Sequence, residues 1–130
     1  MIKHTTLDHL QLEAAYYGIG LSLPSIIRSA DHLQEVRKSD INVGDLIFVK
    51  TVKSLYRIGY LGDGAYEVSG GWFGNKGISS VRIRISGCTW GGSAIKIDLV
   101  AACGLRIEFG NRLVTSPVQK FFILPQYCQN

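Results

Sequence analysis

Residues 56–68 read YRIGYLGDGAYEV, and this stretch decides the fold because apolar and polar side chains alternate on both sides of a glycine-rich turn. A two-residue loop would set Tyr60 opposite Glu67 and would mix apolar with polar faces. A three-residue loop sets Tyr60 opposite Tyr66 and keeps the apolar faces together, with Gly64 in the left-handed conformation of a bulge. The stretch therefore predicts an antiparallel hairpin with a three-residue loop.

Short strand-like segments continue this pattern on both sides of the hairpin. An apolar run precedes it, three segments of alternating aliphatic and charged residues follow it, and Pro117 interrupts the chain before a last apolar strand. About seven or eight short strands with glycine turns between them predict a small antiparallel β barrel or sandwich. The barrel is SH3-like in architecture only, because no specific motif identifies a family. In chain order these segments are 46–49, 81–85, 95–99, 105–109 and Val118–Leu124.

Residues 1–40 differ from the rest because their apolar side chains follow helical spacing. Residues 5–17 predict a first helix, which ends before Gly18. A second helix is predicted within 24–38, beginning either at Pro24 or at a capping box further along the segment. Neither helix is apolar on all sides, so we expect each to lie on the β body with one face in water.

The length of 130 residues and the hydrophobic content of 46% predict one α+β domain, with two N-terminal helices on a small antiparallel β barrel or sandwich. It divides into a helical part (1–40), a β body (41–125) and a tail (126–130). No apolar run reaches the length of about 20 residues that crosses a bilayer, and the N-terminus has no apolar signal-peptide core, so we expect no membrane partner and a cytoplasmic location. Three cysteines are too few for a disulfide framework, and we expect them to be reduced.

The net charge of +4 is unevenly placed, because residues 44–130 hold ten lysines and arginines against five aspartates and glutamates. Basic residues interleaved with aromatic ones are typical of surfaces that neutralise phosphates and stack bases. The leading hypothesis is a non-enzymatic binding module for nucleic acid or another acidic macromolecule. Its candidate contacts are Lys50, Lys53, Arg57, Arg82 and Arg84 for phosphates, with Tyr56 and Trp72 for stacking. The alternative is an ordinary solvated face, on which outward charges such as Lys96, Asp98, Arg106 and Glu108 pair across the sheet.

Both tryptophans stand beside double glycines in mirror order, in residues 69–72 (SGGW) and 90–93 (WGGS). Gly-Gly permits sharp backbone turns, and an indole is either a core side chain or a flat surface for a base or a sugar. We interpret both motifs as corners where strands turn. Trp90 is expected to be buried, whereas the polar loop that follows Trp72 leaves that indole as a candidate ligand platform for nucleic acid or, alternatively, carbohydrate.

Catalysis and metal binding have less support in the sequence. Cys88 lies in a glycine-rich turn whose backbone amides would suit an oxyanion, which makes it a weak candidate nucleophile. A thiolate needs a base, and all three histidines lie in the N-terminal part of the chain, so a small buried thiol is the competing interpretation. No ligand spacing predicts a metal ion, and no phosphate loop predicts a cofactor.

The last predicted strand, Val118–Leu124, ends in the apolar run FFIL. An open edge of this hydrophobicity is an aggregation hazard, so the strand is expected to pair within the barrel or across a homodimer interface. A homo-oligomeric structural or regulatory interaction domain is therefore the second functional hypothesis.

Overall fold

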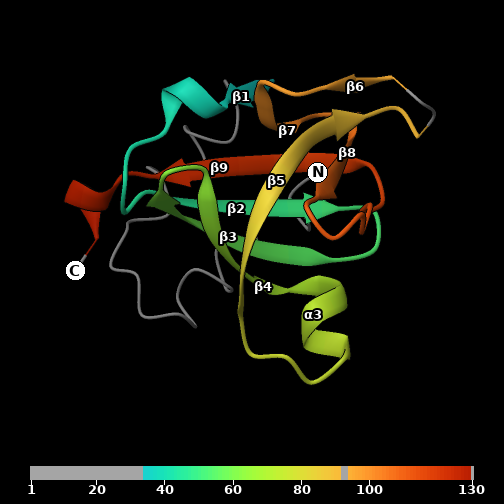
Figure 1. The fold of residues 1–130 in the computed structure, drawn as a ribbon, viewed down its shortest axis with the longest axis horizontal. Coiled ribbons are helices and arrows are strands. Elements are labelled where there is room, and N and C mark those ends of the chain that lie inside the picture. Colours follow the sequence, from blue (N-terminus) through green and yellow to red (C-terminus); the bar gives the residue numbers. More distant parts are fainter. Residues whose placement is uncertain (1–33, 92–93, 130) are drawn as a thin grey trace, which may run out of the picture.

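The computed structural model describes residues 34–91 and 94–129, so the helix predicted over 5–17 and most of the one predicted within 24–38 lie outside it (Figure 1). The described chain is mostly β-strand, and its strands form a curled antiparallel sheet that resembles half of a barrel (Figure 1). In this form the predicted antiparallel β body is confirmed. The strands are β1 (Glu35–Arg37), β2 (Leu46–Thr51), β3 (Leu55–Gly62), β4 (Ala65–Gly70), β5 (Val81–Thr89), β6 (Ile95–Lys96), β7 (Leu99–Ala102), β8 (Arg106–Phe109) and β9 (Val118–Leu124). The described residues also form three short helices between or after these strands: η1 (Lys38–Asp40), α3 (Gly71–Asn75) and η2 (Gln126–Cys128).

The main sheet has the strand order β6-β5-β4-β3-β2-β9, and β8 pairs with β5 outside this path. The first half of β5 pairs with β4, and its second half pairs with β8. The register shifts between Ile85 and Gly87, where a Cβ on Gly87 would overlap the carbonyl oxygen of Lys96. This bulge lets one long strand bend from one half of the sheet into the other, which produces the curl (Figure 1).

The central hairpin has the predicted side-chain pairing but a different turn. Tyr60 faces Tyr66, and their ring centroids are 5.0 Å apart. Gly62 also pairs with Ala65, so the loop is the two-residue Asp63-Gly64 turn, in which both residues have positive φ (53° and 76°). The predicted three-residue loop is wrong, because a register shift between Tyr60 and Gly62 realigns the apolar faces that the tight turn alone would have mixed.

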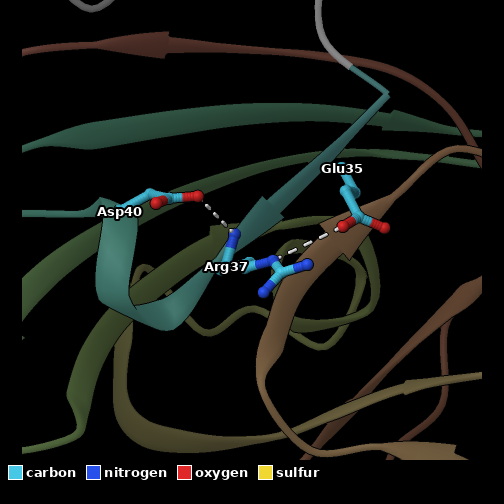
Figure 2. A network of polar contacts seen from close by, with 3 residues as sticks. All are labelled: Glu35, Arg37 and Asp40. Atoms are coloured by element: carbon cyan, nitrogen blue, oxygen red, sulfur yellow. Dashed lines mark hydrogen bonds and ion pairs between the residues drawn. The ribbon is translucent and has the colours of Figure 1, made fainter.

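The end of the predicted second helix is a strand instead. Val36 is buried and pairs with Ala101 of β7, while its neighbours Glu35 and Arg37 are exposed, as alternation along a strand requires. Figure 2 shows how polar contacts close this segment: the Arg37 backbone N–H donates to Asp40 Oδ2 (3.2 Å), and Arg37 Nε lies 3.6 Å from Glu35 Oε2. Long-range pairing with β7 therefore overrides the helical spacing at Glu35–Arg37, and the chain returns to a short helix only at η1.

The predicted strand over 95–99 is divided in two. β6 ends at Lys96, Ile97 is 68% exposed, and the chain then turns into β7, which pairs with β1. The alternation was correct for the flanking residues, but Ile97 lies in the turn and not in the core. The predicted tail is also more ordered than expected, because the Gln126 backbone N–H donates to the buried Asp45 carboxylate (3.0 Å).

The core lies on one face of the sheet and includes apolar side chains from all the longer strands. On the opposite face of β2 and β9, Phe48 and Phe122 are paired in register, are buried and stack at 5.0 Å between ring centroids. β9 is therefore paired with β2 within the chain along most of its length, which satisfies one of the two expectations for Val118–Leu124.

Candidate functional site

Both tryptophans are partly in solvent: Trp72 is 38% exposed and Trp90 is 60% exposed. The prediction that Trp90 is buried is wrong. Thr89, the last residue of β5, occupies the buried position, and its hydroxyl donates to the Ala94 carbonyl (2.6 Å) and accepts from the Gly91 N–H (3.1 Å). This hydroxyl fixes the turn that Trp90 begins, so the indole lies on the outside of the corner.

Trp72 is held by α3, a short helix that begins at Gly71 and follows Gly70, both of which have positive φ. A Cβ on Gly71, whose φ is +49°, would overlap the Tyr56 ring, and the Trp72 backbone N–H donates to the Tyr56 hydroxyl (3.2 Å). The next residue, Phe73, is buried and packs edge-on against the rings of Tyr56 (6.4 Å) and Phe109 (5.5 Å). Phe73 thus anchors the helix, and the Trp72 indole packs edge-on against the Phe73 ring (5.4 Å) while its outer part stays in solvent.

Trp72 lines an open pocket of about 570 Å³, here called the Trp72 pocket. Its opposite wall is residues 113–117 of the connection from β8 to β9, which lies between α3 and the end of β5 (Figure 1). Two hydrogen bonds connect Ser116 of this wall to the end of β2 and the residues that follow it. The Lys53 backbone N–H donates to Ser116 Oγ (3.0 Å), and Ser116 Oγ donates to Thr51 Oγ1 (2.8 Å). The pocket is lined by Val52, Lys53, Ser54, Tyr56, Trp72, Asn75, Arg106 and residues 113–117.

Trp90 lines a second pocket, of about 350 Å³, which shares Arg106 and Val114 with the first. The Arg106 guanidinium donates to the Thr115 carbonyl (3.4 Å), so its side chain is held where the two pockets meet. We call the two pockets together the tryptophan groove. The remaining lining residues of the Trp90 pocket are Thr89, Gly91 and Glu108.

The groove is predominantly basic. Lys76 Nζ lies 5.6 Å from the Trp72 ring centroid, and Lys96 Nζ lies 5.6 Å from that of Trp90. Exposed cation–π contacts of this kind contribute only about 0.5–1 kcal/mol. Among the residues that line the groove, Lys53 and Arg106 are cations and Glu108 is the one carboxylate. The pockets therefore combine aromatic surface with positive charge.

The expected cross-strand charge pairs are not formed. Within residues 34–91 and 94–129 the one ion pair is that of Glu35 and Arg37. Lys96 of β6 and Arg106 of β8 lie on opposite sides of β5, because β5 pairs with each of these strands along a different edge. Because the alternation suggested that these two cations pair with carboxylates across the sheet, the sequence did not predict that Arg106 lines both pockets or that Lys96 lies beside Trp90.

The structure brings together three of the seven predicted contact residues. Lys53, Tyr56 and Trp72 line the Trp72 pocket, although Tyr56 is 5% exposed and supports α3 more than it offers a stacking surface. Arg82 and Arg84 line a separate pocket of about 370 Å³ beside Asp63. The other two lie elsewhere: Lys50 donates to the Thr51 carbonyl in β2, and Arg57 is half-buried in β3 opposite Phe48.

Cys88 is fully buried in β5, and burial raises the pKa of its thiol to about 12. A thiol that stays protonated at neutral pH is a poor nucleophile. The neighbouring Lys38 ammonium favours the thiolate but does not offset burial, which also lowers the pKa of Lys38 itself. The three histidines lie within residues 1–33, outside the described residues.

No group of three or more His, Cys, Asp or Glu side chains in the described chain is arranged to hold a metal ion. Of the helices in residues 34–91 and 94–129, none has the length and apolar character to cross a membrane. The chain matches no protein-family model, and the comparisons with curated proteins and with solved structures also give no match.

Proposed function

We propose that this chain is a non-enzymatic binding module for nucleic acid and that the tryptophan groove is its binding site. One observation carries the proposal: two exposed indoles, each with a lysine ammonium near its ring, line pockets that share Arg106. Aromatic side chains that stack bases and cations that neutralise phosphates are the two components of such sites.

The proposal changes the predicted set of contacts. Lys53 and Trp72 remain, Tyr56 becomes a support for α3, and Arg106 becomes the central cation. Trp90 is added as a second aromatic surface, with Lys76 and Lys96 beside the two indoles. Lys50, Arg57, Arg82 and Arg84 contribute at most to the general field of the surface, because none of them lines the groove.

Carbohydrate is the other candidate ligand for the tryptophan groove, because an exposed indole also stacks on a sugar ring. Four cations around the groove favour a polyanion over a neutral saccharide, since uncompensated positive charge adds nothing to the binding of an uncharged ring. The cytosol suits a nucleic-acid ligand, and it agrees with three cysteines that are all free thiols.

Fluorescence anisotropy with labelled oligonucleotides at low salt tests the proposal. We expect binding that weakens as salt rises, with a logarithmic slope of about 0.7 for each phosphate neutralised on a single strand. Arg106→Ala should weaken binding several-fold and reduce the slope by about 0.7, corresponding to one lost contact.

The matched control is Arg82→Ala, an exposed strand arginine outside the groove, which should change the affinity little. Absence of binding at low salt would overturn the proposal. Binding that is indifferent to salt, or equally strong binding of a neutral oligosaccharide, would favour the carbohydrate alternative.

A further inference from the structure

We infer that the tryptophan groove accepts a single strand, with one unpaired base stacked on Trp72 and a second on Trp90. This inference rests on the proposed function and specifies its ligand. The first step is that the backbone that carries each indole is held by packing and hydrogen bonds. Trp72 follows Gly71, which packs on the Tyr56 ring, and its own backbone N–H donates to the Tyr56 hydroxyl; next to Trp90, the Thr89 hydroxyl bonds to the backbone of Gly91 and Ala94. Surfaces that are already in place bind a flat partner with little loss of side-chain freedom.

The second step concerns which nucleic acids can present a base face. In a duplex each base is stacked between its neighbours, so only base edges are accessible in the grooves. An indole needs the face of a base, which a single strand offers without unstacking a helix. Two exposed indoles in adjoining pockets therefore favour unpaired bases over paired ones.

The third step is the place of the cations. Arg106 lines both pockets, so its guanidinium lies between the two stacking surfaces, where the phosphate that links two splayed nucleotides would be neutralised. Lys76 and Lys96 make exposed, weak contacts with the indoles. A base that displaces either ammonium leaves it free to contact a flanking phosphate.

Three probes at the same low salt concentration test this inference: a single-stranded oligonucleotide, the duplex of the same sequence, and a polyphosphate chain without bases. We expect the single strand to bind at least about tenfold more tightly than the duplex, consistent with base–aromatic stacking. Trp72→Ala and Trp90→Ala should each weaken single-strand binding about tenfold without changing its salt slope, and should leave polyphosphate binding unchanged.

Matched variants separate stacking from folding. Trp90→Phe should recover part of the affinity that Trp90→Ala loses, because it restores an aromatic face. Tyr127→Ala removes an 88% exposed aromatic side chain outside the groove and should have no effect. Since the chain has two tryptophans, Trp90→Phe and Trp72→Phe each leave one fluorescent reporter, and single-strand binding should quench both.

The outcomes distinguish the two proposals. If single strand and duplex bind equally and Arg106→Ala still weakens binding, the proposed function stands and the single-strand inference fails. The inference also fails if Trp90→Ala binds as tightly as the unmodified chain. If no nucleic acid binds at low salt, both proposals fail.

Discussion

Trp72 and Phe73 are consecutive residues of α3, and their side chains occupy opposite environments. Phe73 is 1% exposed and packs against Tyr56 and Phe109, whereas Trp72 is 38% exposed and lines a pocket. The same division holds for the whole chain, because all five phenylalanines are buried and both tryptophans are exposed. Hydrophobicity alone does not produce this division, since burying a large apolar side chain typically contributes about 1.5–3 kcal/mol.

The phenylalanines and the tryptophans therefore have different roles. The phenylalanines hold the curled sheet together, and the tryptophans remain at its surface beside positive charge. Two large aromatic side chains that stay exposed, although burying them would stabilise the fold, are typical of a binding surface. The experiments below test whether stability and binding divide in the same way.

The largest expected effect separates the two neighbours in α3. Phe73→Ala should lower the free energy of unfolding by about 3–5 kcal/mol, because it leaves a cavity between Tyr56 and Phe109. Trp72→Ala should lower it far less. Urea denaturation of both variants measures the difference, and Phe73→Leu, at under about 2 kcal/mol, serves if Phe73→Ala does not fold. If both alanine variants lost the same free energy of unfolding, Phe73 would not be the anchor of α3 and Trp72 would not be a surface residue.

The next effect comes from the glycines of the same helix. Gly71→Ala should cost about 1–3 kcal/mol and disturb the groove, because its backbone has a positive φ and the new methyl group meets the Tyr56 ring. Gly74→Ala is the matched control, since its Cβ would meet no atom within 4 Å. It should be neutral or stabilise the protein by about 0.4–1 kcal/mol. Thermal denaturation of the two variants measures the difference. Equal melting temperatures for Gly71→Ala and Gly74→Ala would contradict this account of α3.

Alkaline pH should destabilise the fold through two buried groups. Burial raises the pKa of Cys88 from 9.0 to about 12 and that of Tyr66 from 10.0 to about 12. Each group's contribution is complete below its unfolded pKa and declines as pH rises toward the folded value, by about 1.4 kcal/mol per pH unit. The measurement is the free energy of unfolding from pH 8 to 12. Cys88→Ala should flatten the decline that starts at pH 9, and an unchanged slope in this variant would count against the assignment.

The smallest effects are expected for exposed side chains. Trp90→Ala and Glu35→Ala should each change the free energy of unfolding by less than about 0.5–1 kcal/mol, because one indole is mostly in solvent and the Glu35–Arg37 ion pair is exposed (Figure 2). Chemical denaturation at low and high salt measures both. A loss of several kcal/mol in Trp90→Ala would mean that the indole is structural, and the contrast with the phenylalanines would then disappear.

The alternation of apolar and polar residues predicted the strands of this fold better than the turns and register shifts between them. The pairing of Tyr60 with Tyr66 follows from alternation, but the tight turn and compensating register shift at Leu61 do not, because two loop geometries satisfy the same pairing. Helical spacing failed at Val36 because a partner some 65 positions away, Ala101, determines its strand conformation.

The candidate site was predicted in part, and its missing members have physical reasons. Lys53 and Trp72 were found because charge and aromatic composition are visible in sequence. Trp90 was missed because the buried residues before it suggested a buried corner, and Arg106 was missed because alternation placed it beside Glu108 and Lys96 on one outward face. The structure shows that β6 and β8 pair with different edges of β5 and are therefore not neighbours.

The pairing of β2 with β9 has a consequence for the order in which the molecule is assembled. Leu46 pairs with Leu124, so the second edge of β2 remains without its partner until the ribosome has released residues 118–124. Pairings of such long sequence separation slow folding, because a long loop must close before the contact is gained. We therefore expect refolding in milliseconds to seconds rather than microseconds. Until β9 has paired with it, β2 has an open edge and is the segment most prone to aggregation.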